Sequence, residues 1–318
     1  NYNGLRRHGR TEEAKQSKLI VGPWPHALSQ SPRTGDVDFG APSMVDLEAM
    51  ELRWFDYWLK GRENGIVDEP PIRLFIMGVN EWRDEYEWPL ARTDWQKWHL
   101  HSGGRANTLI GDGALSTDTP GDESPDRDEP PDRFTYDPLY PVPTRGGNTC
   151  CSPHIVPWGP YDQRDIEMRG DVLCYTSAPL DADLEVTGPI EVVLYAATDC
   201  RDTDWTAKLV DVSPTGYARN LCDGIIRGRC RESFTDPTLL DPGKIYEYGI
   251  EVGVTGNVFR RGHRIRLEIS SSNFPRFDRN LNTGNSGATD TEPQRANQTV
   301  FHSKEYPSHI LLPVVPKT

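Results

Sequence analysis

The sequence lacks the patterns that mark membrane, secreted and nucleic-acid-binding proteins. No run approaches the ~18–20 consecutive apolar residues that a membrane-spanning helix requires. The chain does not open with a charged segment followed by an apolar one, so no secretory signal is visible. Basic residues are outnumbered, 35 Lys and Arg against 48 Asp and Glu, and the net charge is −13. We therefore expect a soluble globular protein whose partners include neither nucleic acid nor an anionic membrane.

Cysteine is scarce, and its spacing does not suit a structural zinc site. No Cys-x-x-Cys pair occurs among the six cysteines, and only Cys150 and Cys151 are neighbours. The other four stand singly in predicted strands or within three residues of their ends, where a free thiol acts as a small buried apolar group. This usage favours a reducing compartment such as the cytoplasm. We expect neither a metal nor a cofactor.

Proline and glycine are abundant, at 27 and 28 residues, so we expect frequent turns and few long helices. Residues 1–18 are polar and predicted helical, and "LIVG" at 19–22 predicts a short buried strand. A clear helix is predicted over 43–60, with Ser43 as its N-cap and Gly61 just past its last turn. Apolar residues at three- and four-residue spacing predict that one flank packs in a core: Met44, Leu47, Trp54, Phe55 and Trp58.

From about residue 70 the apolar period changes from that of a helix to that of a strand. The alternation is clear at 246–254 and 264–269, and "SPTG" at 213–216 predicts a hairpin turn. Many short strands without intervening helices predict a β-sandwich, with a jelly roll as its expected form. Other predicted strands are 72–76, 172–176, 190–197, 205–212, 217–227 and 309–315.

Residues 112–132 form a strongly acidic segment that holds eight Asp and Glu and a single Arg. The segment invites comparison with a calcium loop, but the EF-hand spacing with its central Gly and terminal Glu is missing. We therefore predict a solvated surface loop without a bound metal.

The most distinctive short pattern is "LIVGPWPHAL" at 19–28, in which a strand stops at a Gly-Pro-Trp-Pro turn and presents His26. An imidazole is the side chain best suited to accept and return a proton near neutral pH. In α/β-hydrolases the catalytic histidine follows the last strand, and a helix comes after it, as residues 43–60 do here. A histidine in a Pro-rich turn can also be structural, but this context favours His26 as a catalytic base.

A catalytic histidine of this kind requires a nucleophile, and the chain does not offer one. The hydrolase order places a Gly-x-Ser-x-Gly elbow and then an acid before the histidine. "GNSGA" at 284–288 resembles the elbow, but it lies in a polar stretch with no strand before it. Asp36 and Asp38 follow His26 and do not fit the order. On the residues alone, His26 would be one member of a triad whose other members lie outside this chain.

Several long segments in order closely resemble one group of serine hydrolases. They include "LIVGPWPHA" (19–27), "PPIRLFIMGVNEWRDEYEWPL" (70–90), "DVLCYTSAPL" (171–180), "SSSNFPRFDRNLNTG" (270–284) and "YPSHILLP" (306–313). This is the group of cocaine esterases, α-amino-acid ester hydrolases and X-Pro dipeptidyl-peptidases, the CocE/NonD-like enzymes. The resemblance covers nearly the whole chain, and the family's Gly-Pro-Trp-x-His motif assigns the catalytic histidine to His26.

The resemblance implies that this chain is the C-terminal half of such a hydrolase. Residues 1–70 would be the C-terminal part of an α/β-hydrolase domain, and 71–318 a jelly-roll, galactose-binding-like β-sandwich. Family members are about twice as long, and their nucleophilic serine and acid lie in the N-terminal half. The implied partners are that missing N-terminal half and a small ester or amide substrate. A homo-oligomer is a further expectation, since a partial α/β sheet exposes an unpaired edge.

The implied reaction is acyl transfer to water, in which a serine attacks a carbonyl while His26 takes its proton. The isolated chain should be inactive. Residues 146–164 occupy the region that helps to wall the acyl pocket in relatives, and Cys150, Cys151 and Trp158 are candidate pocket residues. The alternative for that segment is an ordinary surface connection.

A non-enzymatic binding module is the rival class, because jelly rolls also bind carbohydrate or protein. Trp158, Trp205 and Phe274 would then be the candidate platforms for a sugar ring. The remaining histidines lack metal-ligand spacing and are expected to be structural or solvent-facing: His99, His101, His154, His263, His302 and His309.

Overall fold

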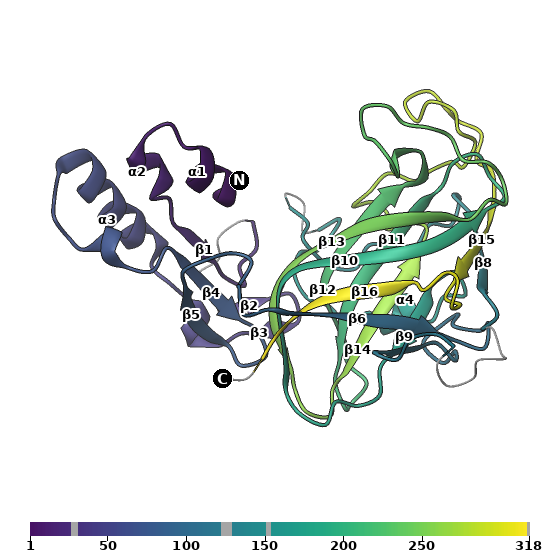
Figure 1. The fold of residues 1–318 in the computed structure, drawn as a ribbon, viewed down its shortest axis with the longest axis horizontal. Coiled ribbons are helices and arrows are strands. Elements are labelled where there is room, and N and C mark those ends of the chain that lie inside the picture. The colour runs from purple at the N-terminus through teal and green to yellow at the C-terminus, as the bar shows by residue number, and fades with distance from the viewer. Residues whose placement is uncertain (27–30, 122–128, 151–153, 317–318) are drawn as a thin grey trace.

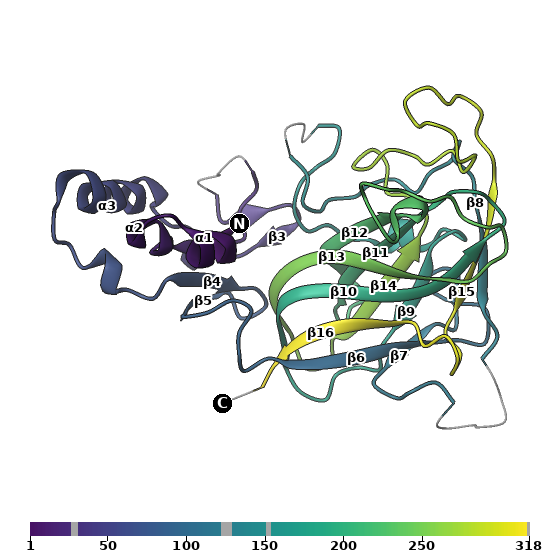
Figure 2. The same cartoon turned by 45° about the horizontal axis from the view of Figure 1, so that its top comes forward.

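The protein forms two lobes, one small and partly helical and one large and built of strands (Figure 1, Figure 2). The computed structural model describes residues 1–26, 31–121, 129–150 and 154–316. We call residues 1–85 the N-terminal lobe and residues 94–316 the β lobe. No helix in the described ranges is both long and apolar enough to span a membrane.

The N-terminal lobe is organised around a short sheet in which β1 pairs in parallel with β4, and β4 pairs antiparallel with β5. Leu19 lies opposite Ile72 and Val21 opposite Leu74. The lobe comprises α1 (Tyr2–His8), α2 (Glu12–Lys15), β1 (Leu19–Val21), β2 (Arg33–Thr34), β3 (Val37–Asp38), the 3-10 turn η1 (Ala41–Ser43), α3 (Leu47–Lys60), the 3-10 turn η2 (Ile66–Asp68), β4 (Ile72–Ile76) and β5 (Glu81–Glu85).

The helix predicted over 43–60 is confirmed over Leu47–Lys60, but its start and its packing differ from the prediction. Ser43 lies in η1, and the N-cap is Asp46, whose side chain accepts a hydrogen bond from the Ala49 amide. Gly61 ends the helix in the left-handed conformation, as predicted. Every residue of α1, α2 and α3 is described, and none is buried.

The prediction that one flank of α3 is buried in a core is therefore wrong for the described residues. Phe55 is 51% exposed, and Met44, just before the helix, is 45% exposed. The pattern on the helix is amphipathic, but the surface that would cover its apolar side is not part of the described residues.

The β lobe is a large mixed sheet, which confirms a mostly β fold. Its strands follow the order β12-β11-β14-β9-β7-β6-β16-β10-β15-β8, with β13 paired to β10, and only the short β7–β9 contact is parallel among the described pairs. The elements are β6 (Asp94–His101), β7 (Ala114–Ser116), β8 (Asp132–Tyr136), α4 (Arg164–Glu167), β9 (Leu173–Thr176), β10 (Leu184–Thr198), β11 (Asp204–Val212), β12 (Ala218–Arg227), the 3-10 turn η3 (Gly228–Cys230), β13 (Tyr246–Phe259), β14 (Arg264–Ser270), β15 (Ala296–Phe301) and β16 (His309–Val315).

The strands of the β lobe enclose one large apolar core and two smaller buried apolar clusters. Trp205 on β11 belongs to the large core, with its ring 5.8 Å from that of Tyr248 on β13 and 6.3 Å from that of Phe134 on β8. Trp205 is fully buried, so its candidacy as a sugar platform is wrong. Alternation along β11 placed this residue on the inner face, where an aromatic side chain contributes to packing.

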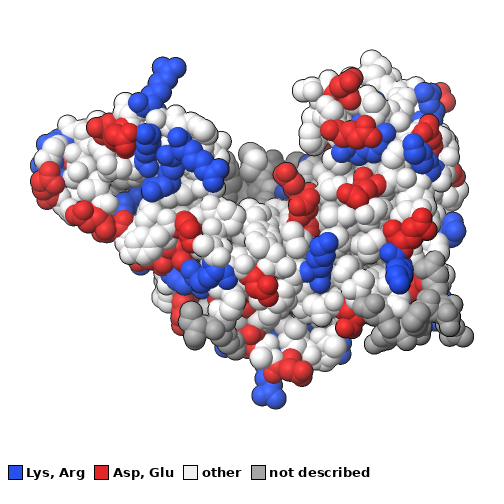
Figure 3. All heavy atoms as spheres, viewed as in Figure 1, with Lys and Arg blue, Asp and Glu red and all other residues white. Residues whose placement is uncertain are grey.

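Charged side chains of both signs are mixed over the face of the molecule seen in Figure 3. Lys and Arg gather over α1 and α2 on that face, and the last turn of α1 contains Arg6, Arg7 and His8. The net charge of −13 is thus not spread evenly, and the N-terminal lobe carries a locally basic surface.

Candidate functional site

His26 lies where the sequence predicts it, on a bend that follows the carboxyl end of β1. It is exposed, and its imidazole makes no hydrogen bond with any described residue. An exposed ring at the end of a parallel strand is free to meet a group brought from outside the chain. The ring is not enclosed among apolar neighbours, which a purely structural histidine in a core would be.

The turn that carries His26 is fixed by side chains from elsewhere in the N-terminal lobe. The indole nitrogen of Trp24 donates a hydrogen bond to the Ser43 carbonyl at 2.8 Å. The hydroxyl of Thr34 donates to the Pro23 carbonyl at 2.9 Å. The sequence predicted a stiff turn from its two prolines, but it gave no sign of these two anchors.

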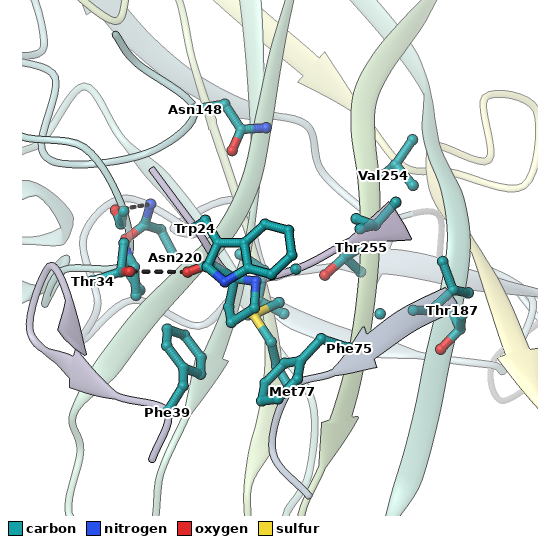
Figure 4. Close-up of a pocket in the computed structure, with 18 of the residues that line it drawn as sticks. Trp24, Thr34, Phe39, Phe75, Met77, Asn148, Thr187, Asn220, Val254 and Thr255 are labelled. Carbon is teal, nitrogen blue, oxygen red and sulfur yellow. Dashed lines mark hydrogen bonds between the residues drawn. The ribbon is translucent and has the colours of Figure 1, made fainter. Parts of the chain in front are cut away.

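A cavity of about 440 Å³ lies directly behind this turn, between the two lobes (Figure 4). Its volume falls in the range of small-molecule sites, which are mostly apolar with a few polar groups. Thr255 on β13 is buried, and its hydroxyl, which has no hydrogen-bond partner among the described residues, lies toward Trp24. The apolar lining includes Leu19, Trp24, Phe39, Phe75, Met77 and Trp88.

The segment 146–164 reaches this cavity, but through residues other than the predicted ones. Gly147 and Gly159 pair with each other and line the cavity together with Asn148 and Pro160. Trp158 is half-buried and Cys150 is exposed and disulfide-bonded, and neither lines the cavity. Cys151 lies outside the described residues. A role for these three residues in an acyl pocket stays a prediction.

No serine in the described ranges sits on a strand-to-helix elbow of the Gly-x-Ser-x-Gly type. Residues 284–288 lie in an irregular connection between β14 and β15, where the Ser286 carbonyl accepts hydrogen bonds from the Thr289 and Asp290 amides. This confirms the prediction that the segment is a loop. His26 therefore has no nucleophile among the residues that the structure describes.

A different serine, Ser102, does contact a histidine and a carboxylate, deep in the β lobe. Its hydroxyl lies 3.1 Å from His302 Nε2 and donates to Asp132 at 2.7 Å. His302 Nε2 lies 3.0 Å from Asp132, and its Nδ1 lies 2.9 Å from Glu129. Burial alone would lower the pKa of His302, but the hydrogen bonds to Asp132 and Glu129 outweigh it and raise the pKa to about 9.

This cluster is structural rather than catalytic. A fully buried imidazole held between two carboxylates keeps its proton at neutral pH and cannot act as the base for Ser102. The hydrogen bonds from His101 and His302 also overcome burial at Glu129 and lower the pKa of that carboxyl to about 2. The cluster thus ties together strands β6 and β8 and the residue that follows β15.

The same cluster corrects the prediction of a solvated acidic loop at 112–132. Asp132 is fully buried and Glu129 is half-buried, because both carboxylates turn inward to His302. Residues 122–128 lie outside the described residues. The sequence missed this arrangement because the partners are 170 or more positions apart, and no local pattern joins them.

Comparison with known proteins identifies the family. The description "X-Pro dipeptidyl-peptidase C-terminal non-catalytic domain" matches residues 64–311. That is more than half of the chain, and the chain belongs to this family, the C-terminal domain of CocE/NonD-type hydrolases. His26 lies before the matched range, in the part of the chain that this description does not cover.

Individual relatives extend the likeness to the N-terminal lobe. Cocaine esterase of Rhodococcus sp. (strain MB1 Bresler) is 42% identical over 98% of this chain and 54% of its own length. A putative serine esterase of Mycobacterium bovis is 28% identical over 82% of this chain and 41% of its own. An α-amino acid ester hydrolase superposes with a TM-score of 0.77 at 28% identity, covering 93% of this chain and 50% of its own. The chain spans about half the length of the curated relatives it matches.

Proposed function

We propose that this chain is the C-terminal half of a serine hydrolase of esters or amides, and that His26 is its general base. The observation that carries the proposal is the exposed His26 on a pinned turn beside a cavity of about 440 Å³. The serine esterases among its relatives support the reaction class. The nucleophilic serine and the acid would come from an N-terminal half, which the length of those relatives leaves room for.

The reaction that this arrangement supports is acyl transfer to water. The serine hydroxyl attacks the carbonyl carbon of the substrate, and His26 accepts the hydroxyl proton. His26 then gives that proton to the leaving alcohol or amine. In the second half, a water molecule attacks the acyl-enzyme, and His26 takes and returns its proton in the same way. No residue of the β lobe takes part in these steps.

The fold of the two lobes fits this proposal. The N-terminal lobe, with a helix pair before β1 and α3 after it, would be the last portion of an α/β-hydrolase domain. This portion extends beyond the expected residues 1–70, because β4 pairs with β1 and β5 pairs with β4. Since β1 pairs only with β4 among the described strands, its other edge could accept a further strand. The β lobe would be the jelly roll that packs beside that domain and closes the substrate site.

The proposal is tested by measuring p-nitrophenyl ester hydrolysis by the chain alone and together with the proposed N-terminal half. We expect the isolated chain to be no faster than buffer containing imidazole, because His26 has no nucleophile to activate among the described residues. The two halves together should be active, and His26→Ala should lower kcat by on the order of 10⁴-fold or more. His8→Ala on α1 is the matched control and should leave the rate unchanged.

Besides inactivity of the two halves together, two outcomes would overturn the proposal. One is a saturable esterase rate in the isolated chain that His26→Ala abolishes. The other is an active pair of halves in which His26→Ala has no effect. For the alternative of a sugar-binding module, Trp205 is buried and Phe274, at 38% exposure, is covered in part by the Arg279 guanidinium, which leaves the half-buried Trp158 as the remaining candidate platform.

A further inference from the structure

The bend that carries His26 has few backbone hydrogen-bond donors. Pro23 and Pro25 have no amide hydrogen, so two of the five residues from Gly22 to His26 offer no backbone donor. In the described part of the chain, no backbone–backbone hydrogen bond outside the strands involves these five residues. Among the described residues, the hydrogen bonds that hold the bend come from side chains.

Trp24 is the side chain that connects the bend to the rest of the lobe. Its indole nitrogen donates to the Ser43 carbonyl at 2.8 Å, and Ser43 is buried at the end of η1. Its ring also folds back over Gly22, where an added Cβ would lie 2.5 Å from the ring carbons. Glycine at position 22 is thus what allows the ring to close over the bend.

A second indole supports the first. The Trp82 nitrogen on β5 donates to the Pro42 carbonyl at 2.6 Å, so two indoles bind consecutive carbonyls of η1. The centroids of the two indole rings lie 5.6 Å apart, and Trp82 also meets the edge of Phe75 on β4 at 5.3 Å. The contact between the Trp24 and Trp82 rings therefore joins the bend and η1 to the small sheet.

Thr34 provides an independent anchor on the other side of Trp24. Its hydroxyl donates to the Pro23 carbonyl at 2.9 Å, and Thr34 itself is buried on β2. Two hydrogen bonds from different elements hold positions 23 and 24, and the ring of Pro25 fixes the φ angle of position 25. Only His26 is left to project from this restrained bend.

We propose that Trp24 is a positioning residue for His26, that it acts through its hydrogen bond to the Ser43 carbonyl, and that Thr34 assists it through the Pro23 carbonyl. This inference rests on the proposed function, since the orientation of the His26 ring affects the rate only if the ring transfers a proton in the reaction. Misplacing a catalytic group by about 1 Å can cost on the order of 100-fold in rate, which is the scale of effect at stake.

The kinetic test uses both halves together and two conservative variants. Trp24→Phe keeps an aromatic ring but removes the N–H, and should lower kcat about 10- to 100-fold with KM within about twofold. Thr34→Val removes the hydroxyl at nearly constant shape and should lower kcat less, while Thr34→Ser should restore it. Trp95→Phe on the exposed side of β6 is the matched control and should change neither constant.

A second measurement on the isolated chain does not depend on catalysis. The backbone amide order parameter of His26 should be near 0.85 in the parent and fall below about 0.6 in Trp24→Phe. If the two halves together prove inactive, the proposed function fails, and the order parameters still decide whether Trp24 fixes the bend. The inference is overturned if Trp24→Phe keeps the kcat of the parent, or if the order parameter of His26 is the same in both proteins.

Discussion

The two lobes differ in how far their apolar residues are buried. Every residue of β11 in the β lobe is buried, whereas none in α3 of the N-terminal lobe is. Both segments have clear apolar patterns in the sequence, one with the period of a strand and the other with that of a helix. The difference lies in what covers them, since β11 has partner strands within the chain and α3 does not.

A periodic pattern of apolar residues predicts which side of a helix or strand will be covered, but it does not predict which polypeptide will cover that side. The β lobe completes its own core, as an autonomous unit does. The N-terminal lobe presents apolar side chains on α3 and an edge of β1 that pairs with no other described strand, and these features agree with a chain that spans half of its relatives' length.

The largest loss of stability is expected from a substitution in the core of the β lobe. Trp205→Ala removes a fully buried indole from between Tyr248 and Phe134 and should lower the free energy of unfolding by ~3–5 kcal/mol. Urea denaturation followed by far-UV circular dichroism measures it. Trp95→Ala, at a ring that is 44% exposed on β6, is the control and should cost much less. Equal costs at the two positions would contradict a core that contains Trp205.

The β lobe was also the more predictable of the two from sequence. The strands predicted at 205–212 and 309–315 agree with β11 and β16 to within one residue, and the turn at 213–216 is present. Local alternation and turn residues carry that information. The strands β6, β8 and β15 were missed, since polar residues interrupt the alternation in each of them. The short strand β7 was missed because it lies within the acidic segment predicted to be a surface loop.

The candidate site was predictable only in part, and for a physical reason. The strand, the prolines and His26 lie within eight residues, so the sequence showed an imidazole presented by a stiff turn. The anchors on Ser43 and Thr34, and the cavity wall supplied by Thr255, come from distant positions. Contacts of that kind depend on tertiary packing, and no local pattern in a single sequence reports them.

A smaller effect, specific to the β lobe, is expected from the ionisation of His302. Its native pKa is about 9, above the ordinary 6.5, so the native state holds the proton more tightly than the unfolded chain. The stabilisation is complete below pH 6.5 and is lost as the pH rises through about 9. The free energy of unfolding should fall by ~3 kcal/mol at most over this range. The groups around the His302 ring are Glu129, Asp132, Ser102, His101 and Tyr175.

Urea midpoints measured between pH 6 and pH 10 test this. The midpoint of the parent should fall across that window, and His302→Gln should start lower and vary less. The N-terminal lobe offers the contrast, because His26→Gln leaves every group that contacts His302 in place, and the fall caused by His302 should persist in that variant. A parent midpoint that stays constant from pH 6.5 to pH 9.5 would show that His302 is not held as an imidazolium.

The smallest effect is expected on α3, and it bears most directly on the difference between the lobes. Phe55→Ala should change the free energy of unfolding of the isolated chain by ~0.5 kcal/mol or less, because half of the ring is already in contact with water. If a proposed N-terminal half covers α3, the same substitution should weaken the association of the two halves by ~1–3 kcal/mol, measured by titration calorimetry. Phe234→Ala, an 81% exposed ring in the β lobe, is the control and should alter neither quantity.

An unchanged association constant for Phe55→Ala would show that the N-terminal half does not cover α3 at this position. Sedimentation of the parent and of Phe55→Ala at the same concentration tests a second possibility. If the parent forms dimers that the substitution disrupts, a second copy of the chain covers α3, and the N-terminal half does not.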